Sequence, residues 1–417
     1  MELKRVVVTG LGAITPIGNN VTDYWDALLN GVSGAAEISS FDIEKYKTKF
    51  ACEVKNFNPL DFFDRKEARK HDRYSQLGMV AAGQAIEDSG INAKDVDKNK
   101  VGVIWGSGIG GLNTFMQEVG NYVKGDGTPR FNPFFIPKMI ADICAGHISI
   151  KYGFRGPNFA TVSACASSAN ALSDAFNYIR LGKAVAFVAG GSEAAVNTTG
   201  VGGFNAMHAI STRNDDPLTA SRPFDKDRDG FVIGEGGGGM IFEELEHALA
   251  RGAKIYAEVA GAGLSGDGYH MTAPHPEGDG ARRCMQAAIE DAGITIEDID
   301  HINTHGTSTP VGDIVEPKAI VNLFGEHAYK ININSTKSMT GHLLGGAGAI
   351  EAIATLLAVK NDIVPPTINH FTDDPNIDSR LNFTFGKAQK RTVNIALSNT
   401  FGFGGHNASL IFKKFAK

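Results

Sequence analysis

The sequence lacks the features that mark several protein classes. It has only four cysteines, and Cys52, Cys144, Cys165 and Cys284 form neither a CxxC pair nor a zinc-binding spacing. This pattern excludes a sequence-evident zinc module or disulfide framework and is typical of a reducing compartment. Basic residues are not in excess, because the net charge is -6, so nothing indicates a general affinity for nucleic acid.

Long hydrophobic runs are also missing. No apolar segment approaches the roughly 20 residues that a helix needs to cross a bilayer. The first residues, 4–10, predict a strand and not a signal peptide. We therefore expect a cytoplasmic protein with no membrane attachment.

Glycine is abundant, with 50 residues in a chain that has no low-complexity linker. This content indicates tight turns and close approach of the backbone to ligands. Apolar, strand-like segments at 101–105, 185–189 and 393–397 alternate with helical patterns such as 172–179. The alternation predicts an α/β fold.

One internal repeat divides the chain. Residues 85–91 and 288–294 have nearly the same sequence, and each copy runs into a strand followed by a Gly-containing turn. We expect two duplicated α/β halves, residues 1–255 and 256–417, with the functional site where they meet. The alternative is two unrelated helix–strand units that share a common type of helix end.

Residues 162–168 contain the candidate nucleophile. A short apolar strand at 159–162 leads into Cys165 and an amphipathic helix leaves it, as in a nucleophile elbow. A thiol at a helix N-terminus lies at the positive end of the helix dipole, so we expect a lowered pKa and a reactive thiolate. The other interpretation is a buried structural cysteine, which we adopt for the remaining three cysteines.

Two histidines lie in turns next to predicted strands and helices. His305 ends a strand at 300–304, and the carboxyl ends of strands in α/β sheets face ligand sites. His342 precedes a Gly/Ala-rich helix at 343–360, whose dipole disfavours an imidazolium, so we expect a neutral ring. A buried Glu351 in that helix would need a partner, and Lys337 is the candidate. Taken singly, each of these residues could equally be incidental.

A Gly-rich turn at 399–407 lies between two closing strands. Flexible backbone beside Phe403 would allow this turn to gate a pocket and supply an oxyanion N–H, although an ordinary long hairpin has the same pattern. Near the N-terminus, Gly10 and Gly12 suggest a dinucleotide motif, but Thr15 stands where the third glycine belongs. We assign that segment a structural role.

Taken together, the segments 164–167, 305–309 and 337–342 resemble the motifs of the β-ketoacyl-acyl carrier protein synthases. The resemblance covers the chain from residue 8 to residue 405 and is greatest to the type II elongating enzymes of fatty acid synthesis. It implies a thiolase-like, five-layer αβαβα fold built from two similar halves, and a homodimer.

The resemblance also implies a decarboxylative condensation that lengthens an acyl chain by one malonyl-derived unit. The implied catalytic residues are Cys165, His305, His342, Lys337, Glu351 and Phe403. The cysteine would carry the acyl chain, the two histidines would polarise the malonyl thioester, and the Lys–Glu pair would order the histidines. Backbone N–H groups of the cysteine and of Phe403 would hold the oxyanion. The implied substrate-binding residues are Ile109, Phe204, Thr307, Thr309, Phe401 and Gly402.

The implied partner is acyl carrier protein in its acyl and malonyl forms, and the chemistry needs no metal or redox cofactor. Because that carrier is acidic, we expect a basic docking patch. Lys66, Arg69 and Lys70 fall on one face of a predicted helix and match the family's docking helix. A run of charges is also the pattern of an ordinary solvated face.

Other functions stay open at this point. A degradative thiolase shares the fold but needs a second cysteine in its C-terminal glycine loop, and no cysteine follows Cys284. A non-catalytic chain-length partner would lack the nucleophile, which is present here as Cys165. A thiol hydrolase would need a histidine base oriented by an acid, and Lys337 stands in that region instead. Type I and polyketide-type ketosynthases use the same chemistry as the elongating enzymes.

Overall fold

The computed structural model describes residues 3–416, in which ten strands form one hydrogen-bonded sheet. The strands of the first half are β1 (Val6–Ile14), β4 (Val101–Gly106), β5 (Asn158–Thr161), β6 (Ala186–Glu193) and β7 (Gly236–Glu244). Those of the second half are β8 (Ala257–Gly266), β9 (His301–Asn303), β10 (Asn332–Asn334), β13 (Ile395–Gly402) and β14 (His406–Lys413).

The two halves of the sheet have the same topology. Their strand orders are β5-β4-β6-β7-β1 and β10-β9-β13-β14-β8, so each strand has a counterpart at the same place in the other half. The halves join where β1 and β8 pair antiparallel over Val6–Val8 only. The duplication expected from the sequence repeat is therefore confirmed, because the two repeat copies lie at the ends of α3 (Arg73–Ser89) and α10 (Asp279–Ala292), the helices that pack on the counterpart strands β1 and β8.

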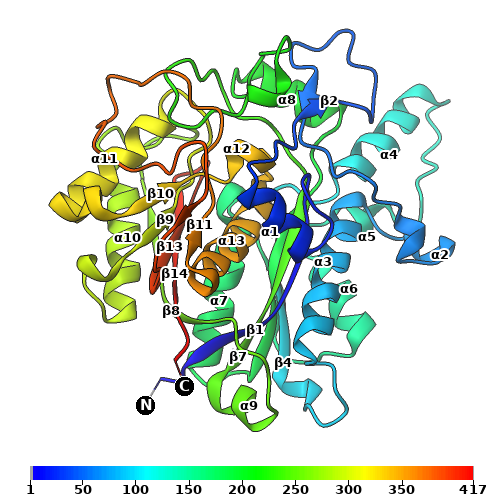
Figure 1. Ribbon diagram of the computed structural model, residues 1–417. Coiled ribbons are helices and arrows are strands. Elements are labelled where there is room, and N and C mark those ends of the chain that lie inside the picture. The colour runs from blue at the N-terminus through cyan, green and yellow to red at the C-terminus, as the bar shows by residue number, and fades with distance from the viewer. Residues whose placement is uncertain (1–2, 417) are drawn as a thin grey trace.

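Helices complete five layers, which Figure 1 shows from α10 on one side to α3 on the other. The middle layer is α7 (Ser167–Arg180) and α13 (Ala347–Asn361), which pack against each other between the two halves of the sheet. One outer layer contains α3 and α6 (Ile143–Tyr152), and the other contains α10 and α11 (Gly312–Phe324). The predicted αβαβα arrangement is confirmed.

Shorter elements connect these layers at the sheet ends. The helices are α1 (Val21–Leu29), α2 (Arg65–Ala68), α4 (Leu112–Lys124), α5 (Phe135–Met139), α8 (Thr198–Ala206), α9 (Leu245–Ala250) and α12 (Lys337–Thr340). Two-residue strands form the pairs β2 (Ala36–Glu37) with β3 (Phe50–Ala51) and β11 (Ile363–Val364) with β12 (Gln389–Lys390).

The N-terminal glycines have the structural role expected of them. A Cβ on Gly12 would lie 2.0 Å from the carbonyl oxygen of Ala81, and one on Gly10 would lie 2.2 Å from that of Ala85. Glycine at these positions therefore lets α3 pack directly on β1. The strand β1 continues through Gly10 and Gly12 and ends at Ile14.

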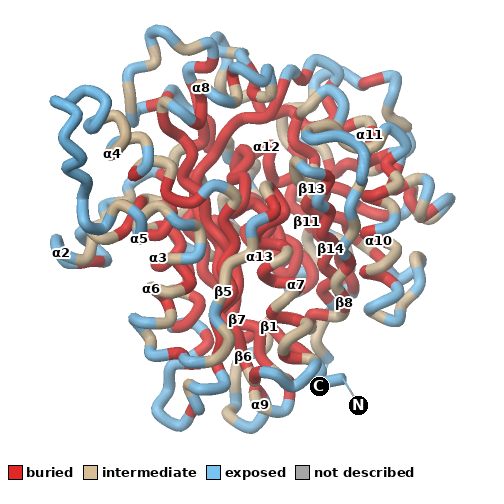
Figure 2. Tube along the Cα trace, turned by 180° about the vertical axis from the view of Figure 1, so that it is seen from behind, coloured by how far each residue is buried: buried red, intermediate tan, exposed pale blue. Residues whose placement is uncertain are grey.

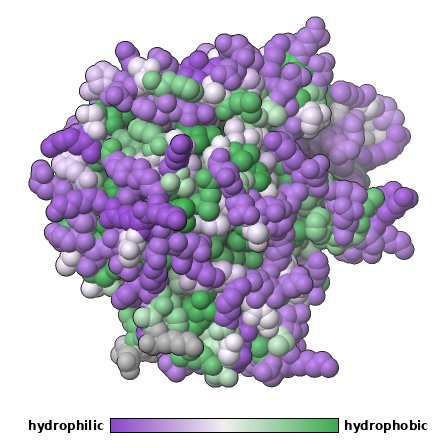
Figure 3. Space-filling model, in the orientation of Figure 1, coloured by the Kyte–Doolittle hydropathy of each residue, from purple (hydrophilic) through white to green (hydrophobic). Residues whose placement is uncertain are grey.

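The middle layer is the most deeply buried part of the molecule, and Figure 2 shows it as a continuous red interior within exposed outer loops. In α13 every residue from Ala347 to Val359 is buried, so this helix is enclosed on all sides, unlike an amphipathic surface helix. No helix among residues 3–416 is long and apolar enough to cross a membrane. Hydrophilic side chains cover most of the face in Figure 3, with apolar side chains in small groups between them.

Candidate active site

Cys165 lies in a tight turn at the middle of the molecule. The 3₁₀ turn Ala164–Ala166 joins β5 to α7, so the predicted strand–turn–helix arrangement is present. Ala164 has a φ of 51°, a left-handed conformation that is strained for a residue with a side chain. Ser167 holds the turn, because its Oγ donates to the Ala164 carbonyl at 2.7 Å and accepts the Ser163 N–H at 3.0 Å. The thiol is thereby aimed away from the helix that follows it.

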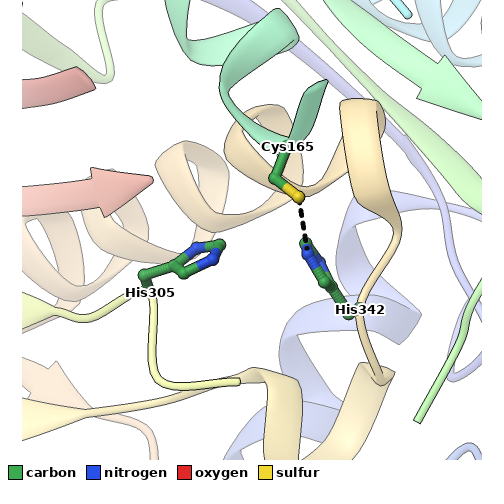
Figure 4. A group of neighbouring side chains, drawn as sticks. All are labelled: Cys165, His305 and His342. Carbon is green, nitrogen blue, oxygen red and sulfur yellow. Dashed lines mark hydrogen bonds between the residues drawn. The ribbon is translucent and has the colours of Figure 1, made fainter. Parts of the chain in front are cut away.

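The two histidines approach this thiol from the second half of the chain. His305 follows β9, and His342 lies between α12 and α13. The His342 Nε2 is 3.0 Å from the Cys165 Sγ, and the two imidazole ring centroids are 5.3 Å apart. Figure 4 shows both rings turned toward the sulfur. Three residues that are far apart in the sequence therefore converge on one point.

The protonation states differ in part from the sequence-based expectation. Burial raises the pKa of the Cys165 thiol to about 12, although Lys337 and the Phe403 N–H act in the opposite direction. The expected low thiol pKa was wrong, because removing the thiolate from water outweighs the helix dipole. Burial, with the nearby Lys337 charge, lowers the pKa of both His305 and His342 well below 6.5, so both rings are neutral, as predicted for His342.

Lys337 and Glu351 form a direct ion pair, and both side chains are almost completely buried. Neither lines the pocket. Burial raises the pKa of Glu351 to about 7, while the Lys337 ammonium opposes that rise. The partner expected for Glu351 is therefore the one observed, and its cation also acts on the charge state of the histidines.

Glu316 was not identified from the sequence, although it holds the His305 turn. Its carboxylate accepts the backbone N–H groups of His305 and Gly306, each at 2.9 Å, and the Asn399 side-chain N–H at 3.2 Å. Burial raises its pKa to about 7. An acidic residue between apolar neighbours in the helix 312–324 was the available signal.

A pocket of about 540 Å³ opens onto the sulfur. It is lined by all six residues implied as substrate-binding: Ile109, Phe204, Thr307, Thr309, Phe401 and Gly402. The hydroxyls of Thr307 and Thr309 are 3.0 Å apart. The wall is mostly apolar with a few polar groups near the thiol, which is the usual composition of a site for an acyl chain.

The Gly-rich segment is a hairpin that also lines the pocket. β13 ends at Gly402 and β14 begins at His406, so the segment is a hairpin, and Gly402 and Phe403 line the pocket. A Cβ on Gly402 would lie 2.9 Å from the Ser163 carbonyl and 3.1 Å from the Cys165 nitrogen. Glycine at this position therefore brings the hairpin against the nucleophile turn, with the Phe403 N–H close enough to lower the thiol pKa.

The predicted docking helix is much shorter than expected. α2 contains only Arg65–Ala68, and Arg69 is its C-cap, so Lys66, Arg69 and Lys70 do not share a helical face as predicted. Asp64 caps the helix start, and the chain turns away after one turn. Lys66 and Arg69 are exposed, whereas the Lys70 ammonium pairs with Glu67 at 2.5 Å.

The cysteine and the two histidines also place three possible metal-ligand atoms within 4.8 Å of one another. This donor set is of the zinc type. The Lys337 charge, which lowers the pKa of both histidines, would oppose a second cation at the same point. The residues therefore fit a resident metal poorly.

Comparisons with known proteins agree over the whole chain. Family models for the Beta-ketoacyl synthase N-terminal and C-terminal domains match residues 3–248 and 256–371. The 3-oxoacyl-[acyl-carrier-protein] synthase 2 of Synechocystis sp. is 50% identical over 415 residues, which are 100% of this chain and 99% of that protein. The protein of the same name from Staphylococcus aureus (strain N315) is 50% identical over 412 residues, 99% of each chain.

Solved structures show the same fold. A beta-ketoacyl synthase from Burkholderia phymatum has a TM-score of 0.91 and 35% identity, and the match covers 99% of this chain and 100% of that one. The ishigamide ketosynthase/chain length factor has a TM-score of 0.92 and 34% identity with the same coverage. The family models and the relatives at 50% identity place this enzyme among the condensing acyltransferases, in agreement with its fold and site. The chain belongs to the β-ketoacyl synthase family.

Proposed function

We propose that this enzyme joins an acyl thioester to malonyl-acyl carrier protein, with loss of CO2, to give 3-ketoacyl-acyl carrier protein in fatty acid elongation. The observation that carries the proposal is the convergence of Cys165, His305 and His342 within 4.8 Å at the inner end of an apolar pocket. The relatives that are 50% identical are named for that synthase activity. The elongating enzymes are thereby favoured over the other members of the family.

The first step of the proposed mechanism is acyl transfer to the cysteine. The neutral thiol lies 3.0 Å from the His342 Nε2, which can accept its proton as the sulfur attacks the thioester carbonyl. The bond to the carrier sulfur then breaks, and the departing carrier thiolate takes this proton, so the imidazole is neutral again. The backbone N–H groups of Cys165 and Phe403 would hold the oxyanion, since the hairpin presses Gly402 against the cysteine nitrogen. Preorganised N–H donors stabilise charge only as it develops, which is what this step requires.

The second step is decarboxylation of the malonyl group. Neutral imidazoles can donate hydrogen bonds to the malonyl thioester oxygen and stabilise the enolate as CO2 leaves. The resulting carbanion attacks the acyl thioester and frees Cys165. Lys337 and Glu351 would act as positioning residues, because they are buried outside the pocket while the Lys337 charge acts on both histidines. We propose that no metal or redox cofactor takes part, since decarboxylation itself supplies the carbanion.

We propose acyl carrier protein as the partner that delivers both substrates. A structural neighbour with 33% identity and a TM-score of 0.90 is a type II ketosynthase in complex with its acyl-carrier protein. The exposed Lys66 and Arg69 remain the proposed contacts for an acidic carrier, although they do not form a helical face. Thr307 and Thr309 would bind the pantetheine arm inside the pocket.

We also propose a homodimer of two-half subunits in the cytoplasm. The nucleophile comes from residues 1–255 and the two histidines from 256–417. The edge strand β5 and its surroundings expose apolar side chains, among them Val162 at 61% and Ile150 at 78%. An exposed edge strand and apolar patch of this kind suit a second copy. The four unpaired cysteines are consistent with a reducing compartment.

The proposal is tested by a condensation assay with acyl and malonyl carrier proteins, followed by mass spectrometry of the product. We expect one two-carbon addition per turnover, release of 3-ketoacyl carrier protein and an equal amount of CO2. Polyketide ketosynthases are structural neighbours, so repeated additions to one chain without reduction would favour that second function. Extension of coenzyme A esters without malonyl carrier protein would contradict both.

A further inference from the structure

Glu193 is a second buried acid that the sequence motifs did not identify. It ends β6, lines the pocket and has no exposed surface. Within residues 3–416, no Lys, Arg or His forms an ion pair with it; hydrogen-bond donors alone surround its carboxylate. A buried carboxylate costs much free energy unless it is well hydrogen-bonded, so its presence here requires a reason.

The Glu193 carboxylate joins two turns that are distant in the sequence. Its Oε2 accepts the Gly108 N–H at 2.7 Å and the Gly345 N–H at 3.1 Å. Its Oε1 accepts the Ser107 hydroxyl at 2.8 Å and the Ile109 N–H at 3.2 Å. One side chain therefore holds the turn after β4 against the turn after His342.

These two turns form the pocket wall beside the thiol. Ile109 and Leu344 project from them into the pocket, together with Ala164 of the nucleophile turn. The turns touch each other, because a Cβ on Gly345 would lie 2.2 Å from the Gly108 nitrogen. Leu344 itself has a φ of 47°, so its backbone is held in a conformation that it would not adopt unaided.

Only a carboxylate provides this set of contacts. Its Oε2 accepts from two donors and its Oε1 from three, the third being the Gly110 N–H at 3.3 Å. A glutamine would place an NH2 group against N–H groups at one of the two positions. Loss of a hydrogen bond to a charged acceptor costs more than loss of one between neutral groups. A glutamine at this position would therefore let the two turns separate or shift.

We infer that Glu193 is a positioning residue that sets the acyl-pocket wall at Ile109 and Leu344, and so determines which acyl-chain lengths reach Cys165. This inference rests on the proposed condensing function. A short acyl group occupies only the space next to the sulfur, whereas a long chain must pass along the wall that the two turns form. Displacing that wall therefore affects long chains more than short ones.

The test is acylation of Cys165 by a short-chain and a long-chain acyl carrier protein, followed by intact-protein mass spectrometry. For Glu193→Gln we expect kcat/KM to fall at least about tenfold more for the long chain than for the short chain. A tenfold difference corresponds roughly to the loss of one hydrogen bond to a charged group. The matched control is Glu243→Gln. Glu243 is equally buried, but it binds Thr9 and Arg251 and lies outside the pocket lining.

The control should lose stability without a change in the chain-length ratio beyond about twofold, since its contacts are remote from the wall. An unchanged ratio in folded Glu193→Gln would overturn the inference. Glu193→Asp, which keeps the charge but shortens the reach, should also shift the ratio. If neither variant folds, the residue is only structural and the inference is wrong. Absence of acylation in the unmodified enzyme would instead contradict the proposed function.

Discussion

At the scale of single residues, the reactivity of the site depends on a neutral thiol beside a neutral imidazole. Burial dominates the charge state of all three central side chains, raising the thiol pKa and lowering those of the histidines. The motif around Cys165 was sufficient to predict the turn and the nucleophile. It was not sufficient to predict the pKa, because burial by the second half of the chain is not visible in a local segment.

Alkylation of Cys165 tests this charge state. With a folded pKa of about 12, the thiol is protonated throughout the neutral range and the thiolate fraction rises with pH. The rate of reaction with iodoacetamide should therefore increase about tenfold per pH unit between about pH 7 and 9. Cys165→Ser identifies the signal from this residue. A rate that reaches a plateau near pH 7 would contradict the raised pKa, because it would mean that the thiol is already ionised there, as the helix dipole alone would predict.

Replacing the nucleophile should separate the two half-reactions. In Cys165→Ala no acyl-enzyme can form, so condensation should fall below detection. Decarboxylation of malonyl carrier protein should continue, because His305 and His342 are retained, and it should vary little between about pH 6 and 8 since both rings stay neutral. The measurement is CO2 release alongside product mass. Equal loss of both activities would contradict the proposed division between thiol and imidazoles.

At the scale of elements, the short helix α12 and the long helix α13 place the ion pair and His342 together. The position of α13 was predictable, because the Gly/Ala-rich run indicated a buried helix near 343–360, but the residues of α12 were not predicted to be helical. The contacts of Glu193 and Glu316 were not predictable from the sequence. Both acids accept hydrogen bonds from backbone N–H groups of other elements. A sequence pattern shows the periodicity within one element, but it does not show which turn of another element packs against it.

Breaking the ion pair should destabilise the enzyme strongly. Lys337→Met leaves Glu351 without its partner in a site where both side chains are only 1% exposed, so we expect a loss of about 3–5 kcal/mol in the free energy of unfolding. The double variant Lys337→Met/Glu351→Gln should recover part of that loss. Urea unfolding of Lys337→Met, Glu351→Gln and the double variant completes a double-mutant cycle. Additive losses would show that the two side chains do not act as a pair.

At the scale of the whole molecule, duplication of one α/β unit explains why the site lies where it does. The nucleophile turn follows the third strand of the first half, and His342 follows the third strand of the second half. The middle helices α7 and α13 then bring these equivalent positions together. The sequence repeat was enough to predict this doubling, but the three-residue pairing of β1 with β8 that joins the halves had no sequence signal.

The proposed homodimer makes a prediction at the same scale. Ile150→Glu and Val162→Arg place charges on the apolar surface around the edge strand β5, and each should shift the enzyme toward monomer in sedimentation or light-scattering measurements. A charge in a buried apolar interface is strongly unfavourable. Leu249→Glu, at an exposed site on α9, is the matched control and should leave the assembly unchanged. If all three variants remain dimeric, the interface lies elsewhere.

The most direct test of the account is to trap the acyl-enzyme. The enzyme is incubated with an acyl carrier protein in the absence of malonyl carrier protein, and the intact mass and its peptides are measured. The account predicts one acyl group per chain, bound as a thioester to Cys165 and released as 3-ketoacyl product when malonyl carrier protein is added. No adduct, or an adduct on Cys52, Cys144 or Cys284, would contradict it.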